Sequence, residues 1–193
     1  MYYGNYKNIR DSAWRCLADF EIDSLPVDIL KITRAAGIRV IKNSCVGDLL
    51  PGEHGKSYFN GHCWIIIYDD TDPTNISRFT IAHELGHFFL GHDMMHTRYQ
   101  NVQKFGTKPK AEQQADMFAL RLLAPACILM GLALESAEDI SKHCGIPLPL
   151  AKERAERIKI LYKKNKFFTN PAEKEVYDNF NTYIKKAKKK MNR

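Results

Sequence analysis

The chain has 193 residues, of which 45% are hydrophobic and 11% aromatic, and this composition excludes a mostly disordered protein. Its formal net charge of +7 would favour a nucleic-acid partner if the basic residues were spread over the fold. They are not, because residues 1–162 carry 19 basic and 19 acidic side chains, whereas residues 163–193 carry ten and three. We therefore expect a neutral body with a basic tail, and no direct binding of nucleic acid.

The cysteine pattern and the apolar segments bear on where the protein works. Five widely spaced cysteines without a Cys-x-x-Cys pair argue against a disulfide framework and fit a reducing cytoplasm. Residues 1–15 contain no apolar core of a signal peptide. The most apolar stretch, residues 117–134, is interrupted by Arg121 and Pro125, so it predicts a core helix followed by a turn. We expect a cytoplasmic protein without membrane association; its oligomeric state is left open.

The first third of the chain predicts two helices and a small sheet. A helix is expected over residues 6–20, and a second from Pro26, in a first-turn position, to a capping glycine at Gly37. Residues 38–41 alternate like a strand. Residues 56–59 and 62–68 predict a hairpin closed by a type I′ turn at Asn60-Gly61, and the apolar run in its second strand predicts a buried strand.

The remaining segments are mainly helical. Asp72 as N-cap and Pro73 open a helix that ends at Gly91, and a polar linker over residues 92–109 follows. Another helix is expected over residues 110–123, stopped by Pro125, and two short helices within residues 137–162. This order of elements predicts an α+β fold.

One motif within the helix after Asp72 carries the chemistry. In His83-Glu84-Leu85-Gly86-His87 the two histidines stand at i and i+4, so they lie on one helix face and direct their rings at one point. Glu84 lies beside that point, placed to take a proton from a metal-bound water. The sequence therefore predicts a metal site with His83 and His87 as ligands and Glu84 as the base.

A catalytic zinc needs a third protein ligand, and two candidates compete. Asp93 has the spacing of the third ligand in metzincin-like sites, but those sites need glycine where this chain has Leu90. Glu112, near the start of the next helix, is the better candidate. Ala115 would let that helix pack closely, and Asp116 faces the same side as Glu112. Asp116 is expected to accept the outer N–H of a ligating histidine.

These motifs resemble the ImmA/IrrE family of metallopeptidases, within the gluzincin group. The similar segments are residues 78–87 and 112–125, with weaker similarity around residues 25–28 and 37–38. The resemblance implies a minimal zincin-like core with a small sheet and an active-site helix. It further implies one Zn²⁺ held by His83, His87 and Glu112, with Glu84 as the base. Another divalent ion is an alternative metal.

The resemblance also implies a substrate. Members of the family cleave a helix-turn-helix repressor of phages or mobile elements and so switch on its genes. The alternative is a DNA-binding or protein-interaction regulator that keeps a metal site without peptidase activity. The residue that stabilises the oxyanion is not identified; Tyr99, His92 and His96 lie in a suitable segment but serve equally well as surface residues.

The C-terminal third predicts additional helices. Residues 136–158 resemble a helix-turn-helix, but Glu153 and Glu156 interrupt the basic residues of its second helix. We therefore favour a helical hairpin that completes the core or recognises the repressor. In the tail, Asn170 as N-cap and Pro171 predict a docked amphipathic helix. We expect a peptidase domain over residues 1–130, the hairpin over 131–162 and the basic helical tail over 163–193.

Overall fold

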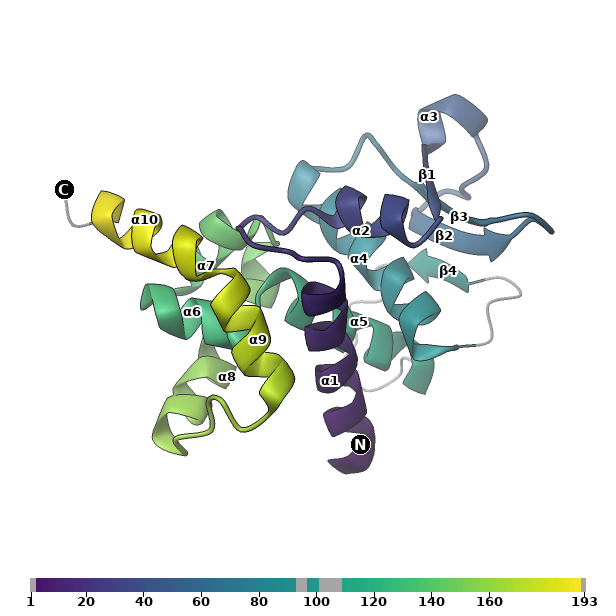
Figure 1. Cartoon of the computed structure of the whole chain (residues 1–193). Coiled ribbons are helices and arrows are strands. Elements are labelled where there is room, and N and C mark those ends of the chain that lie inside the picture. Colours follow the sequence, from purple (N-terminus) through teal and green to yellow (C-terminus); the bar gives the residue numbers. More distant parts are fainter. Residues whose placement is uncertain (1–2, 93–96, 101–108, 192–193) are drawn as a thin grey trace. The chain divides into compact units, whose positions relative to one another are not determined.

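The computed structural model describes residues 3–92, 97–100 and 109–191, and the chain forms two compact units (Figure 1). Residues 29–119 make up what we call the sheet unit. Residues 1–28 together with 120–193 make up the helical unit. A small sheet and many helices confirm the predicted α+β class. The three-part division at residues 130 and 162 stays a prediction.

The sheet unit contains a four-stranded sheet in the order β1-β3-β2-β4. β1 pairs with β3 in parallel, and β2 pairs antiparallel with both β3 and β4. The buried strand expected from the apolar run is β3, and its three isoleucines are at most 6% exposed. The elements of the unit are α2 (Ile29–Ala35), β1 (Arg39–Lys42), α3 (Asn43–Val46), β2 (Glu53–Phe59), β3 (Trp64–Tyr68), α4 (Thr74–Leu90), β4 (Thr97–Gln100) and the start of α5 (Lys110–Leu123).

The hairpin between β2 and β3 is present, but its turn differs from the prediction. The loop holds four residues, 60–63, instead of the two of a type I′ turn. The Asn60 side chain accepts hydrogen bonds from the backbone N–H groups of His62 and Cys63, and this local bonding favours the wider loop.

Two helix starts in the sheet unit also differ. Asp72 does not cap α4, because its carboxylate lies 2.6 Å from Nδ1 of His54, and Pro73 takes the N-cap position. α2 begins at Ile29, so Pro26 lies before the helix; its fixed φ suits an extended lead-in as well as a first turn. The helix ends are as expected, with Gly37 and Gly91 in the left-handed conformation.

β4 was not predicted, since its segment was assigned to a polar linker. It pairs with β2 from Glu53 to Ser57, and an irregularity in the register lies between Glu53 and Gly55. A four-residue polar segment has no hydrophobic pattern that would predict a strand, and it is extended here because it pairs with β2.

The helical unit contains the end of α5 and several complete helices, and these helices enclose a core of their own. Its hairpin, residues 137–163, turns at Gly145 and buries its apolar side chains, including Ile140 and Ile158. This burial agrees with the predicted hairpin that completes the core. The helices are α1 (Tyr3–Asp19), α6 (Ala126–Leu132), α7 (Ala137–Cys144), α8 (Leu148–Lys163), α9 (Pro171–Asn179) and α10 (Asn181–Met191).

The basic tail is a docked helical segment within this unit. Asn170 caps α9 by accepting a hydrogen bond from the N–H of Ala172, as predicted. Val176, Phe180 and Ile184 are buried and Tyr177 is half-buried, in agreement with the predicted docked amphipathic segment, although the helix is interrupted at Phe180. The lysines at the end of α10 are largely exposed.

Among the described residues, one helical stretch, Lys110–Leu132, is long and apolar enough to cross a membrane by length and composition alone. The structure buries 83% of its apolar window, as in the core helices of globular proteins.

Candidate metal centre

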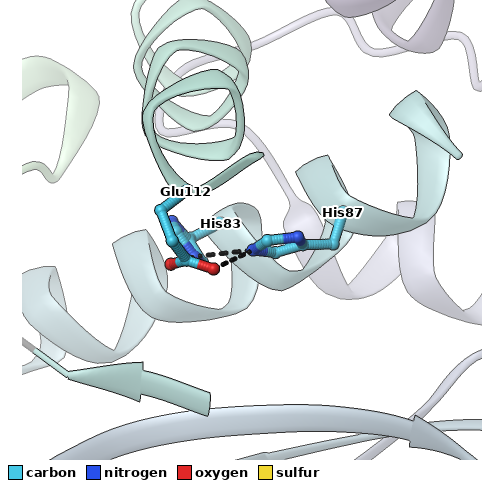
Figure 2. Close-up of side chains that lie close together, drawn as sticks. All are labelled: His83, His87 and Glu112. Atoms are coloured by element: carbon cyan, nitrogen blue, oxygen red, sulfur yellow. Dashed lines mark hydrogen bonds and ion pairs between the residues drawn. The ribbon is translucent and has the colours of Figure 1, made fainter. Parts of the chain in front are cut away.

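His83 and His87 lie on the face of α4 that is turned into the sheet unit. Both residues are completely buried, and their rings face Glu112 and Asp116 of α5. Their Nε2 atoms are 3.1 Å apart, so the two rings point at one position, as the i, i+4 spacing predicted. Figure 2 shows the two rings on α4 converging with the Glu112 side chain.

Glu112 reaches this position from the first turn of α5. Its Oε2 lies 3.2 Å from Nε2 of His83, and its Oε1 lies 3.2 Å from Nε2 of His87 (Figure 2). The Glu112 side chain is 21% exposed, so the cluster is reached from solvent on the Glu112 side. The structure thus brings the two histidines together with the preferred third ligand.

The three donor groups fit a zinc ion. In tetrahedral zinc with bonds of roughly 2.0–2.1 Å, neighbouring ligand atoms are about 3.3 Å apart. The two histidine nitrogens are 3.1 Å apart, close to that value, and with one ligand atom from each residue the three atoms lie within 4.8 Å of one another. Two imidazoles and one carboxylate also match the ligand set of catalytic zinc sites, which leave a fourth position open.

The close approach of α4 and α5 makes this convergence possible. A Cβ atom at Gly86 would lie 3.0 Å from Cα and 3.1 Å from the carbonyl oxygen of Ala115. Ala115 is completely buried, which confirms that a small residue here lets α5 pack closely. On the sheet side, a Cβ at Gly55 would collide with the Thr80 side chain, so Gly55 brings β2 equally close to α4.

The outer nitrogen of each histidine has a different partner. Nδ1 of His83 lies 2.9 Å from Oδ1 of Asp116, the partner predicted from the sequence. Nδ1 of His87 lies 3.0 Å from Nδ1 of His92, whose Nε2 is 3.0 Å from Oε1 of Gln114. Gln114 was not identified from the sequence, and His92 was considered only for the oxyanion.

Glu84 is completely buried beside the two histidines. The hydroxyl of Ser57 on β2 donates a hydrogen bond of 2.5 Å to its Oε2. Ser57 was missed, because only the register of the sheet places it below α4. Its bond holds the carboxylate in one orientation.

The hydrogen bonds within the cluster shift the pKa values of its histidines and of Glu112. Burial by itself lowers the pKa of His83, but the hydrogen bonds to Asp116 and Glu112 outweigh it and raise this pKa to about 9. Burial by itself raises the pKa of Glu112, but the hydrogen bonds from His83 and His87 lower it far below its usual range. Burial and then the neighbouring His87 lower the pKa of His92. The metal-free cluster therefore holds Glu112 ionised.

Three residues considered from the sequence cannot be placed at the site. Asp93, the competing third ligand, and His96 lie outside the described residues. Tyr99 lies on β4, of whose side chains the structure gives no description.

A buried His-Glu-x-x-His helix on a small sheet, with a carboxylate from the next helix, is the arrangement of a zincin-type metallopeptidase. Residues 33–160 match the family model of peptidase family M78, the IrrE N-terminal-like domain. The match covers more than half of the chain, and the protein belongs to this family, as the motifs indicated. No curated protein matches the chain.

Proposed function

We propose that this protein is a zinc-dependent, site-specific endopeptidase that cleaves a helix-turn-helix transcriptional repressor and so derepresses its genes. The observation that carries the proposal is the convergence of His83, His87 and Glu112, whose ligand atoms all lie within 4.8 Å of one another, beside the buried Glu84. Membership of a metallopeptidase family supports the reaction class. The choice of a repressor as the substrate rests on the resemblance of the motifs to the ImmA/IrrE family.

In the proposed mechanism His83, His87 and Glu112 hold the zinc ion. Bound zinc supplies a Lewis acid that activates a water molecule and polarises the peptide carbonyl. The Glu84 carboxylate takes the proton from the attacking water and passes it to the leaving amine. Ser57 keeps that carboxylate in place, and Asp116 holds the His83 ring by its Nδ1.

The sheet suggests how a peptide would lie. β1 and β4 are the outer strands in the order β1-β3-β2-β4. Of these two, β4 is paired with Ser57, through Thr97, so it is one strand away from the residue that contacts Glu84. We place the substrate as an extended segment added to β4, where backbone hydrogen bonds give affinity and side-chain pockets give specificity.

We also propose that the protein acts in the cytoplasm and reaches DNA only through its substrate. The exposed lysines of α10 lie at a helix C-terminus, where the helix dipole favours cations, so they need no nucleic acid to account for them.

The test is co-expression with a helix-turn-helix protein encoded beside the gene. The wild type is expected to give a cleaved repressor, and Glu84→Gln an intact one while still binding one zinc per chain. Glu156→Gln, which changes an exposed glutamate, is the matched control and should cleave normally.

Two outcomes would contradict the proposal. If Glu84→Gln cleaves like the wild type, Glu84 is not the base. If the repressor stays whole while the wild-type protein binds operator DNA with a steep salt dependence, the regulator without peptidase activity is the correct function.

A further inference from the structure

The His87 ring also contacts a residue that is not one of the metal ligands. Its Nε2 faces His83 and Glu112, whereas its Nδ1 faces the ring of His92 at 3.0 Å. The left-handed Gly91 ends α4, and the N–H of His92 donates to the carbonyl of His87 at 3.1 Å. The end of the helix therefore folds His92 back onto the ligand it follows.

The second nitrogen of His92 connects this pair to α5. Its Nε2 lies 3.0 Å from Oε1 of Gln114, two residues after Glu112. One set of proton positions satisfies all three groups when Nε2 of His87 binds a metal. Nδ1–H of His87 donates to Nδ1 of His92, and Nε2–H of His92 donates to the Gln114 amide oxygen, which only accepts.

We propose that His92 and Gln114 are positioning residues for the metal. Together they hold His87 in the tautomer and the ring orientation in which Nε2 ligates. The inference rests on the proposed function, since it requires a metal at His83, His87 and Glu112. It adds to that function a chain of two neutral side chains, which no part of the zincin motif contains.

The two ligand histidines are thereby supported in different ways. Asp116 offers His83 an anionic acceptor, whereas His92 offers His87 a neutral one whose orientation depends on Gln114. An ionised carboxylate oxygen is always an acceptor, but a neutral imidazole accepts only at its unprotonated nitrogen. In this arrangement the amide oxygen of Gln114 accepts from Nε2–H of His92, which leaves Nδ1 of His92 as the acceptor for His87.

The experiment measures the dissociation constant of zinc by competition with a chromophoric chelator. His92→Phe removes the acceptor and is expected to weaken zinc binding by about 10–100-fold, the usual effect of losing an outer partner of a ligand. His92→Asn keeps an acceptor oxygen near the position of Nδ1 and should restore affinity to within a few-fold of the wild type. His62→Phe, at an exposed histidine of the same unit, is the matched control and should not change it.

Gln114 provides a second pair of variants and a second readout. Gln114→Leu should weaken zinc binding, whereas Gln114→Glu keeps an acceptor and should not. The visible absorption of the cobalt(II)-loaded protein reports the ligand geometry. It should shift in His92→Phe and Gln114→Leu and return in His92→Asn. Thermal unfolding of the metal-free variants checks that each one folds.

The outcomes separate this inference from the proposed function. If the wild type and the control bind zinc and His92→Phe and Gln114→Leu bind it equally well, the positioning role is wrong and the peptidase proposal stands. If His92→Asn is as weak as His92→Phe, acceptance at Nδ1 is not what His92 provides. If the wild type binds no zinc, both proposals fail.

Discussion

The two units both bury ionisable side chains, but they use them differently. In the sheet unit, His83, Glu84 and His87 are completely buried, and their side chains contact other side chains that converge from α5 and β2. In the helical unit, Arg154 and Glu173 are 5% and 1% exposed, and they bond to the backbone. Nε of Arg154 donates to the carbonyl of Ala124, and Glu173 accepts from the N–H of Thr169.

This difference shows what identifies a functional site in the protein. A buried charge that satisfies a backbone group near a helix end contributes to the fold. In the sheet unit, ligand atoms from α4 and α5 point at one position and form the ligand set of a zinc ion. Burial of ionisable side chains alone would not separate the two units, whereas the set of metal-ligating groups at one position does.

The strongest test of this distinction removes the ligand from α5. Glu112→Ala is expected to weaken zinc binding by more than about 100-fold, since loss of a ligand costs more than loss of an outer partner. Zinc competition against a chelator measures it, with Glu156→Ala as the control at an exposed site. If Glu112→Ala keeps stoichiometric zinc while Asp93→Ala loses it, Asp93 is the third ligand.

The pH dependence of zinc binding comes next. His83 must be neutral to bind zinc, and its pKa of about 9 in the metal-free protein means that it carries a proton at pH 7. The affinity should therefore rise from pH 7, at first about tenfold per pH unit, to roughly 50-fold at pH 9, and level off at roughly 100-fold above that pH. Glu112 adds no dependence in this range, because its pKa is lowered.

Asp116→Asn sharpens this prediction. Without the carboxylate the pKa of His83 falls, so the plateau should be reached at a lower pH. Affinity that does not change between pH 7 and 9 in the wild type would contradict the proposed exchange of a proton for the metal.

A smaller effect is expected at Ser57. A hydrogen bond to a charged group contributes about 1.5–3 kcal/mol, so Ser57→Ala should lower kcat/KM for repressor cleavage by roughly 10–100-fold. Zinc affinity should not change, because the hydrogen bond that is lost ends on the Glu84 carboxylate, which is the proposed base. Ser24→Ala, at an exposed serine, is the control. An equal loss of zinc affinity would show that Ser57 supports the fold of the site instead.

The smallest effect on the site should come from the helical unit. Arg154→Met leaves the buried Ala124 carbonyl without its donor and should reduce the free energy of unfolding by about 1–3 kcal/mol. Urea unfolding of the metal-free protein measures this loss. Zinc affinity should stay at the wild-type value, and a large decrease would contradict the contrast between the two units.

The sequence predicted those parts of the site that depend on local spacing. His83 and His87 are one helical turn apart, and Glu112 and Asp116 share a face of the next helix, so regular helix geometry is sufficient to group each pair. The structure then brings the two pairs together at the contact of Gly86 with Ala115. The presence of Ala115 indicated that approach, but Gly86 was not recognised as its other half.

The missed residues depend on long-range or irregular geometry. Ser57 reaches Glu84 because of the register of β2, which no local pattern specifies. His92 reaches His87 because one left-handed residue reverses the chain after α4. β4 has no hydrophobic pattern that would predict a strand, and only its pairing with β2 defines it. The loop at Asn60 is wider than predicted because the Asn60 side chain accepts a hydrogen bond from the backbone of the same loop.

The glycine at position 86 has a consequence for the metal itself. A methyl group there would have to move α5 by a few tenths of an ångström, because it would meet Ala115 at 3.0 Å. Glu112 would move with the helix, whereas metal–ligand distances tolerate a deviation of only about 0.2 Å. The bond length available to the ion is thus set by a residue that donates no atom to it. In this protein the fourth residue of His-Glu-x-x-His therefore constrains the distance between α4 and α5, and with it the position of Glu112.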